Sequence, residues 1–315
     1  ADSFAVARLP EAVRLHESGI DKPIVLLSGV LTEVELDEAA RRGFEVVVHC
    51  IEQVELLEAC GSGRVTTWLK FDTGMNRLGF DPSRSEELVQ RLRTCSAVGE
   101  LRLMTHLASA DELDNASTDE QLAAFRKIVR GFDGAVSIAN TPATLGWPEI
   151  AAAPESLGIR GDHWIRPGIG LFGISPFAGQ TGPDLGLKPV MQFEARLIAT
   201  KSLQEGARVG YKGRYRSQSD TVLGIISAGY GDGYTRHFRT GTPVLLNGRS
   251  VPLIGNVSMD MIGVDLGPGA GDRVGDIAVL WGDGLPVETV APWADAIPYE
   301  LVCGVMNRED SEIAN

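Results

Sequence analysis

The chain has 315 residues, of which 43% are hydrophobic and 23% charged, and its formal net charge is −13. This composition is typical of a globular protein with one or two domains. The negative charge argues against nucleic acids and anionic membranes as partners, since both favour a basic surface. The four cysteines show no paired spacing, no metal site is expected, and no apolar run approaches the length of a membrane span. We therefore expect a cytoplasmic protein.

From residue 1 to 178, short apolar segments alternate with amphipathic ones. The apolar segments predict seven strands, at residues 4–7, 24–27, 46–49, 65–71, 101–105, 136–138 and 164–166. The segments between them predict helices. One helix has Thr32 and Glu35 at capping-box spacing and Gly43 at its end, and a later helix starts at Ser117. Strand–helix alternation of this kind predicts parallel strands joined by crossover helices.

Seven strands are one fewer than the eight that close a (β/α)8 barrel. An α/β barrel is the predicted fold of this first part, and a doubly wound open sheet is the alternative that periodicity leaves open. Residues 179–315 instead contain β-branched runs separated by Gly, Asn and Asp, with an Asn-Gly hairpin signal at Asn247–Gly248. They predict a second, mainly antiparallel β domain.

The segment LKFDTGMNRLGF is the first concentration of unusual residues. In a strand, Trp68, Lys70 and Asp72 share one face, which in a barrel points inward near the carboxyl end, where such folds place chemistry. A buried lysine must be paired, neutralised or modified, and Arg77 lies nearby in sequence. A solvated lysine beside a glycine-bounded loop is the alternative.

Polar residues also follow the later strands. His106 comes directly after an apolar strand, where it is either a satisfied polar residue or a catalytic one. Asn140 and Thr141 stand at a strand end, where they can cap a helix or hold a phosphate group. Arg166 ends the last strand, and the amides of the Pro-Gly-Ile-Gly loop that begins at Pro167 can approach an anion closely.

In the β domain, glycine flanks two tyrosines. Tyr211 lies in VGYKG and Tyr230 in SAGYGDGY, and Met259 with Asp260 lies in GNVSMDM. Tyrosines of this kind are commonly turn residues.

Eight motifs in a fixed order carry a family resemblance. They are TGMNRLG, THLASAD, SIANT, RPGIGLFG, VGYKG, GYGDGY, SMDM and YEL. Over residues 1 to about 308 the chain resembles the bacterial-type alanine racemases, which are fold-type III pyridoxal-phosphate (PLP) enzymes. The resemblance implies an α/β barrel that contains strands 2 to 8 in residues 1–178 and lacks the first βα unit, followed by a C-terminal β domain in residues 179–315. It also implies racemisation of L- and D-alanine through a PLP aldimine by two bases, which supplies D-alanine for peptidoglycan precursors.

The resemblance assigns roles to residues of the barrel. Arg166 resembles the arginine that faces the pyridine nitrogen of PLP, and His106 the residue that supports this arginine and the catalytic tyrosine. Arg77 resembles the arginine near the phenolic oxygen of the cofactor. Lys70 matches a lysine that is carbamylated in family members, and the resulting anion would pair with Arg77.

The remaining implied residues bind phosphate and substrate. The implied phosphate-binding residues are Thr141, Gly168, Ile169 and Tyr230. Tyr211 resembles a catalytic base that the partner subunit supplies. Met259 and Asp260 resemble the substrate-side loop, also from the partner, so that a head-to-tail homodimer is implied.

The second base and the Schiff-base anchor are, in this family, one lysine on barrel strand 1. The six lysines of the chain are Lys22, Lys70, Lys127, Lys188, Lys201 and Lys212, and none lies in the expected motif. Ala1 matches the start of strand 2. We therefore expect the lysine to be missing because the strand that would carry it is missing, and we expect no turnover by this chain alone.

Three alternatives remain. The chain can be a truncated or inactive homologue that binds PLP or a phosphate ligand non-covalently, or a related PLP enzyme that acts on serine or on a broader range of amino acids. A phosphate-sugar barrel enzyme would leave the tyrosine motifs of the β domain unexplained.

Overall fold

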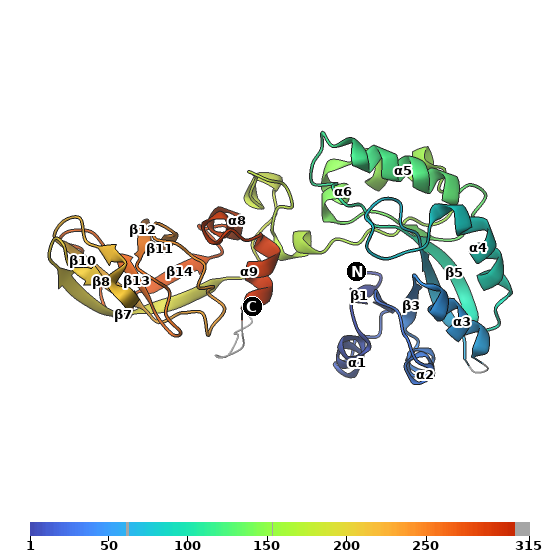
Figure 1. Ribbon diagram of the computed structural model, residues 1–315, viewed down its shortest axis with the longest axis horizontal. Helices are drawn as coiled ribbons and strands as arrows, with labels where there is room; N and C mark the ends of the chain where they lie inside the picture. Colours follow the sequence, from blue (N-terminus) through green and yellow to red (C-terminus); the bar gives the residue numbers. More distant parts are fainter. Residues whose placement is uncertain (61–62, 153, 306–315) are drawn as a thin grey trace. The chain divides into compact units, whose positions relative to one another are not determined.

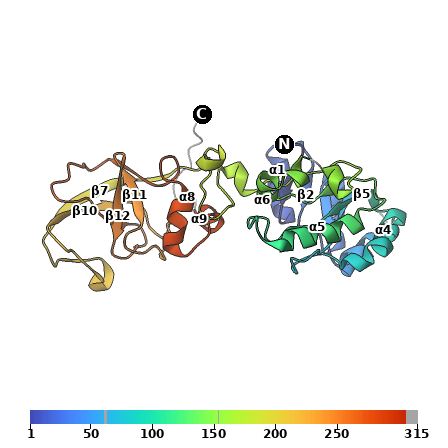
Figure 2. The ribbon, with the colours of Figure 1, turned by 90° about the horizontal axis from the view of Figure 1, so that it is seen from above.

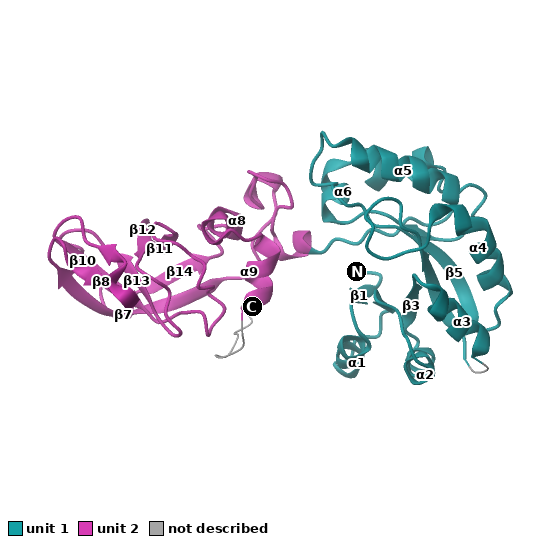
Figure 3. Ribbon diagram, viewed as in Figure 1, with its two compact units in different colours: residues 1–168 teal, residues 169–315 magenta. Residues whose placement is uncertain are grey.

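The computed structural model describes residues 1–60, 63–152 and 154–305, and the chain divides into two compact units (Figure 3). The first unit is residues 1–168 and the second is residues 169–315. The predicted boundary at residue 178 lies later in the chain. The division comes earlier because the side chains of Ile169 and Ile174 pack into the core of the second unit.

The first unit is a curled sheet of parallel strands that follow one another in chain order. The strands are β1 (Phe4–Val6), β2 (Ile24–Leu26), β3 (Glu45–Val48), β4 (Val65–Lys70), β5 (Val98–Met104) and β6 (Val136–Ser137). The helices between and after them are α1 (Leu9–Glu17), α2 (Glu33–Arg42), α3 (Ile51–Ala59), α4 (Ser85–Thr94), α5 (Ala116–Ile128), α6 (Thr141–Gly146) and α7 (Pro148–Ala151). Helices α1 to α5 cover the outer face of the strands (Figure 1, Figure 2).

The seventh predicted strand is extended but does not form a regular ladder. It makes isolated parallel bridges between Val136 and His163 and between Asn140 and Arg166. The backbone N–H of Arg166 donates to the carbonyl of Ala139 at 2.7 Å. The segment therefore continues the sheet beyond β6, and the predicted α/β barrel architecture is confirmed over these strands, while the described residues form a curled sheet that is not closed.

Helix α2 shows how local sequence sets the element boundaries. The Thr32 hydroxyl accepts from the N–H of Glu35 at 3.3 Å, and the Glu35 carboxylate accepts from the N–H of Leu31 at 2.9 Å. Gly43 ends the helix with a φ of 71°. The Thr32 cap and the glycine stop agree with the prediction, because both satisfy backbone groups that a helix end leaves open. The reciprocal half of the predicted capping box differs, because the Glu35 carboxylate binds the N–H of Leu31 and not that of Thr32.

Helix α5 begins earlier than the sequence predicted. Its N-cap is Asn115, whose side-chain oxygen accepts from the N–H of Ser117 at 2.9 Å. The predicted start at Ser117 was therefore wrong. The amide oxygen of asparagine is as good a cap as a serine hydroxyl, and here the earlier residue caps the helix.

Strand alternation gives the sheet an outer and an inner face. Leu69 packs in the large core beneath the helices. Trp68, one residue before it, packs on the inner side with Val47, Met104 and Trp164. Side chains at alternating positions thus separate into two cores, and Lys70 lies on the same side as Trp68.

The inner face also holds a buried ion pair. Arg102 donates to the two carboxylate oxygens of Glu45 at 3.1 and 3.2 Å, and the indole N–H of Trp68 donates to Glu45 at 2.6 Å. The Arg102 guanidinium lies 5.2 Å from the ring of Trp68 and 4.9 Å from that of Trp164. These contacts join β3, β4, β5 and the segment after β6, so that polar groups inside the sheet are satisfied by one another.

The second unit is built around a closed antiparallel barrel. Its strand order is β10-β13-β12-β11-β14-β7. The strands are β7 (Phe193–Leu203), β10 (Thr221–Ile226), β11 (Pro243–Leu246), β12 (Arg249–Ile254), β13 (Ile262–Asp265) and β14 (Ile277–Trp281), with a separate ribbon of β8 (Arg208–Val209) and β9 (Tyr215–Arg216). Two short helices follow, α8 (Val287–Val290) and α9 (Pro298–Gly304). The mainly antiparallel β domain predicted from the sequence is confirmed.

The hairpin between β11 and β12 shows why the Asn-Gly signal was informative. Asn247 and Gly248 connect the paired residues Leu246 and Arg249, and their φ angles are 50° and 76°. Positive φ at both positions is the geometry of the tight hairpin turn that asparagine and glycine adopt most readily. Among the described residues, no helix has the length and the apolar character needed to cross a membrane.

The buried ion pair gives the first testable prediction. Replacing Glu45 with leucine removes one of the two carboxylates that bind Arg102, which keeps its pair with Glu100, and removes the acceptor of the buried Trp68 indole N–H. We expect Glu45→Leu to lower the free energy of unfolding by about 1–3 kcal/mol, measured by urea denaturation, because the indole donor is left buried without an acceptor. Glu58→Leu, which removes a partly exposed pair with Arg91, is the control and should cost about 1 kcal/mol or less. Equal losses for the two variants would contradict the stabilising role of the inner pair.

Candidate active site

Polar side chains of the first unit gather at the carboxyl ends of β4, β5 and β6. Lys70 is the last residue of β4 and is 8% exposed. His106 follows β5, and Arg166 lies on the extended segment after β6. The carboxyl ends of parallel strands lie at one edge of a sheet, and this edge is where barrel folds hold their ligands. Three of the residues selected from the sequence are thereby brought together.

Arg166 is held by several acceptors on neighbouring strands. Its Nη2 donates to the carbonyl of Thr105 at 2.7 Å and to that of Ile138 at 3.3 Å, and its Nη1 donates to the Ser137 hydroxyl. Burial lowers the pKa of Arg166 to about 10, which still leaves the guanidinium charged at neutral pH. The side chain is thus a fixed cation that points into the edge of the sheet.

Two of the groups that hold Arg166 were missed by the sequence reasoning. Ser137 lies within β6, accepts from Arg166, and donates its own hydrogen to the carbonyl of Trp164 at 2.5 Å. Thr105 is fully buried beside His106. A signal for both exists in the sequence, because a small hydroxyl residue at the inward end of an apolar strand must find a buried partner.

His106 contacts the same arginine. Its Nδ1 lies 3.3 Å from Arg166 Nη2, and because a guanidinium can only donate, Nδ1 must accept and a neutral ring carries its proton on Nε2. Burial, and then the charges of Arg166, Lys70 and Arg77, lower the pKa of His106 to about 3. The imidazole is therefore neutral at physiological pH.

Lys70 stands among positive charges. Burial, and then Arg166 and Arg77, lower its pKa to about 8, against the opposing effect of Asp72. The Asp72 carboxylate is itself engaged with the backbone N–H groups of Gly74 and Asn76, at 2.9 and 3.0 Å. A substantial fraction of Lys70 is thus an uncharged amine at pH 8, and the cluster favours an anionic ligand or modification.

The loop that carries Arg77 is closed by backbone hydrogen bonds. The N–H of Asp72 donates to the carbonyl of Phe80 and the N–H of Phe80 donates to that of Lys70, each at 2.9 Å. Gly79 has a φ of 129°, and a Cβ there would lie 2.6 Å from the Asp72 nitrogen. This close approach requires glycine. Arg77 itself is exposed at the end of this loop.

Helix α6 begins at the same edge of the sheet. Asn140 caps it by accepting from the N–H of Ala143 at 3.2 Å. The Thr141 hydroxyl accepts from the N–H of Gly168 at 2.8 Å, so the loop after Arg166 lies against the start of the helix. A hydroxyl and backbone amides in this arrangement are suited to a phosphate group.

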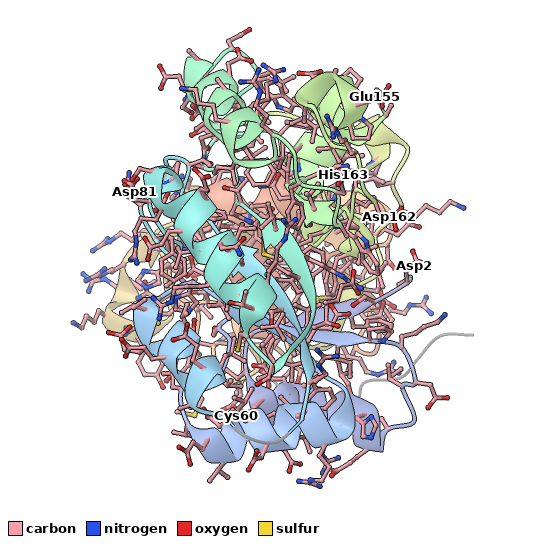
Figure 4. The ribbon with its side chains drawn as sticks, turned by 90° about the vertical axis from the view of Figure 1, so that its right-hand side faces the viewer. Asp2, Cys60, Asp81, Glu155, Asp162 and His163 are labelled. Carbon is pink, nitrogen blue, oxygen red and sulfur yellow. The ribbon has the colours of Figure 1, made fainter. Side chains whose placement is uncertain are left out.

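His163 has a perturbed pKa but lies outside this cluster. Figure 4 shows it beside Asp162 on the segment that leads to Arg166. Burial, and then Arg166, lower its pKa to about 4, and its Nε2 is buried without a hydrogen-bond partner among the described residues. By strand alternation His163 faces away from the side that Trp164 and Arg166 share.

In the second unit, the candidate residues lie on turns next to the barrel. Tyr211 is 70% exposed on a tight turn in which Lys212 has a φ of 63°. The side chain of Asn256 donates to the Tyr211 carbonyl at 3.0 Å. A left-handed lysine is strained, and this hydrogen bond helps to hold the turn that presents the phenol.

Tyr230 and Met259 lie on two loops that pair with each other. The N–H of Tyr230 donates to the carbonyl of Ser258 at 3.0 Å, and the N–H of Gly231 donates to that of Met259 at 2.9 Å. Asp260 follows Met259 on the same loop and is exposed. Ile169 is predicted to bind phosphate through its backbone amide. Its side chain is buried in the core of the second unit.

Comparisons with known proteins identify related chains. The family models for the alanine racemase N-terminal and C-terminal domains match residues 1–176 and 190–313. The alanine racemase of Vibrio parahaemolyticus is 44% identical over 314 residues, which cover 99% of this chain and 85% of the relative. That of Vibrio cholerae is 45% identical over 98% of this chain and 83% of its own length.

Solved structures agree with these matches. The biosynthetic alanine racemase of Pseudomonas aeruginosa has a TM-score of 0.90 and 40% identity, covering 98% of this chain and 84% of its own. The alanine racemase of Bartonella henselae, solved with covalently bound pyridoxal phosphate, has a TM-score of 0.82 and 26% identity, with the same coverage of both chains.

The neutral state of His106 gives a prediction on pH. The unfolded chain has the ordinary histidine pKa of 6.5 and the folded chain a value of about 3, so between these pH values the unfolded chain binds a proton that the folded chain does not. The stability that His106 contributes is therefore present above pH 6.5 and is lost as the pH falls toward 3. We expect the urea stability of His106→Asn to fall less steeply over this range than that of the original sequence. His237→Asn, an exposed histidine of the second unit, is the control, and identical pH profiles for both variants would contradict the assignment.

Proposed function

Because the chain belongs to the alanine racemase family, we propose that it carries the PLP-binding and alanine-binding residues of an alanine racemase, with Tyr211 as one of two bases. The observation that carries the proposal is the buried guanidinium of Arg166, which His106, Thr105 and Ser137 hold at the carboxyl edge of the sheet. Beside it lies the Thr141–Gly168 contact, which is suited to phosphate.

These residues fit the cofactor in two respects. Thr141 and the Gly168 amide would hold its phosphate, with Ile169 and Tyr230 as further proposed contacts. Arg166 would face the pyridine nitrogen, and because a guanidinium only donates, this nitrogen would stay unprotonated. When bound, PLP supplies an electron-withdrawing ring that weakens the bond between the α-carbon of alanine and its hydrogen.

The protein's own groups would then move the proton. Racemisation requires an acid and a base on opposite faces of the α-carbon. In this proposal the phenolic oxygen of Tyr211 takes or returns the proton on one face. The carboxylate of alanine meets Arg77 and the loop of Met259 and Asp260.

The second base is the part of the reaction that these residues do not supply. The family resemblance places it on a lysine, and of the six lysines only Lys70 is buried, at the end of β4. Because Lys70 lies in the motif of the carbamylated lysine and not in that of the anchor, we propose that residues 1–315 bind PLP without a covalent bond to Lys70 and provide one of the two bases.

The partner of this chain is proposed to be a second copy. In a head-to-tail homodimer, Tyr211, Met259 and Asp260 of one subunit would serve the site of the other. The exposure of Tyr211 and Met259, 70% and 52%, supports a role at a surface that another chain covers.

Two alternative functions would give different results when PLP binding and exchange of the α-hydrogen are measured. A truncated or inactive homologue would bind PLP or inorganic phosphate but exchange no α-hydrogen. A related enzyme for other amino acids would exchange serine faster than alanine, and the described contacts around Arg77 and Met259 do not favour either substrate.

The role of Tyr211 can be tested by hydrogen exchange. With PLP and alanine in deuterium oxide, we expect the chain to exchange the α-hydrogen of one enantiomer faster than free PLP does, without racemisation, because one base acts on one face. Tyr211→Phe should slow this exchange by about 100-fold or more, measured by proton NMR. Tyr215→Phe, four residues away in β9, is the matched control and should leave the rate unchanged.

Three results would contradict the proposal. They are equal exchange of both enantiomers, racemisation by this sequence, and attachment of PLP to Lys70 after borohydride reduction.

Mixing the variants Tyr211→Phe and Arg166→Leu tests whether the site is shared between two subunits. Hybrid dimers regain exchange only if each site uses Tyr211 from one chain and Arg166 from the other.

The proposed carbamylation of Lys70 is tested separately. Above pH 8 the Nζ atom is largely uncharged, so it can form a bond to the carbon of dissolved CO₂ and release one proton, giving an anion that Arg77 can pair. With ¹³C-labelled bicarbonate we expect a carbamate signal by carbon NMR that disappears in Lys70→Met. Lys22→Met, at an exposed lysine, should retain it, and a signal that survives in Lys70→Met would refute the assignment.

A further inference from the structure

A buried glutamine on α5 connects the two loops that carry the candidate site residues. Gln121 is 2% exposed. Its Oε1 accepts from the N–H of Ala108 at 2.8 Å, and its Nε2 donates to the carbonyl of His106 at 3.0 Å and to the Thr73 hydroxyl at 3.2 Å. One side chain thus holds the segment after β5 against the loop after β4.

The direction of these hydrogen bonds is fixed by a chain of hydroxyl groups. Thr105 donates its only hydroxyl hydrogen to the carbonyl of Phe71 at 3.0 Å. It must therefore accept from the Thr73 hydroxyl, 2.8 Å away, and Thr73 must in turn accept from Gln121. Only one orientation of the Gln121 amide satisfies this chain and the N–H of Ala108 together.

These hydrogen-bonded hydroxyl groups connect to Arg166, the arginine at the centre of the site. The carbonyl of Thr105 accepts from Arg166 at 2.7 Å, and His106 Nδ1 lies 3.3 Å from the same nitrogen. On the other side, the loop packs directly on Gln121, because a Cβ at Gly74 would lie 3.2 Å from Gln121 Cγ. A shift of Gln121 therefore moves the surroundings of both His106 and Arg166.

We propose that Gln121 is a positioning residue, which fixes His106 and Arg166 relative to the Arg77 loop so that together they bind an anionic ring cofactor. The identity of that cofactor as PLP rests on the proposed function. Gln121 lies behind these groups, on the helix, and acts through the segments that it holds together.

A second buried glutamine provides a matched comparison within the same unit. Gln53 on α3 is also 2% exposed, accepts from the N–H of His49 at 2.8 Å and donates to the carbonyl of Ser28 at 3.1 Å. It joins the ends of β2 and β3 as Gln121 joins the ends of β4 and β5. Its contacts include none of the proposed cofactor residues.

The test compares Gln121→Met with Gln53→Met in the full chain. Each change keeps the volume and removes the hydrogen bonds, so both should lower the urea midpoint by similar amounts. Only Gln121→Met should raise the pKa of His106 from about 3 toward 6.5, because the segment becomes hydrated and the facing groups Arg166, Lys70 and Arg77 separate from it. This pKa is read by NMR titration of the imidazole, with the signal assigned from His106→Asn.

PLP affinity is the second measurement. We expect the dissociation constant to rise about tenfold in Gln121→Met and to stay unchanged in Gln53→Met, as when a group that orients a ligand-binding residue is removed. Thr73→Val, which breaks the hydroxyl chain alone, should shift both quantities in the same direction and decides the question if Gln121→Met fails to fold.

The proposal would be overturned if the pKa of His106 were unchanged in both Gln121→Met and Thr73→Val. It would also be overturned if this pKa shifted equally in Gln121→Met and Gln53→Met. If the original sequence fails to bind PLP, the proposed function is wrong, while the titration of His106 still decides the role of Gln121.

Discussion

Arg166 must keep its charge in a place that water hardly reaches. A buried guanidinium is stable only where acceptors surround it, and here two backbone carbonyls, a serine hydroxyl and an imidazole nitrogen do so. These acceptors come from the ends of adjacent strands. The curvature and register of the sheet therefore determine whether the arginine is satisfied, and the arginine in turn fixes the edge at which the site is built.

Burial and the charge of Arg166 together set the electrostatics of the site. Burial first, and then Arg166, lower the pKa of His106 and of Lys70, which leaves a neutral imidazole and a partly neutral amine beside the arginine. Asp72, the nearby carboxylate, is engaged in closing the loop that carries Arg77. The result is an edge of positive charge that suits a phosphate or a carboxylate in a protein whose overall charge is negative.

Much of the architecture was visible in the sequence because local rules decided it. The capping of α2 by Thr32 and its stop at Gly43, and the hairpin at Asn247–Gly248, depend on residues only a few positions apart. The start of α5 was misplaced, since Asn115 and Ser117 are both good caps and local chemistry does not choose between them. The irregular seventh strand was also beyond local rules, because its bridges depend on where β6 ends.

The sequence by itself determined the alternation of strands and helices, the change to an antiparallel domain, and the order of motifs that marks the family. It could name Lys70, His106, Thr141 and Arg166 because each lies at the end of an apolar strand or shortly after it. Only the tertiary structure decided which groups hold them. Ser137 and Thr105 are marked in the sequence only as hydroxyl residues at the ends of apolar strands, and Gln121 is not marked at all. All three matter because parallel strands bring residues far apart in the chain within hydrogen-bond distance of one another.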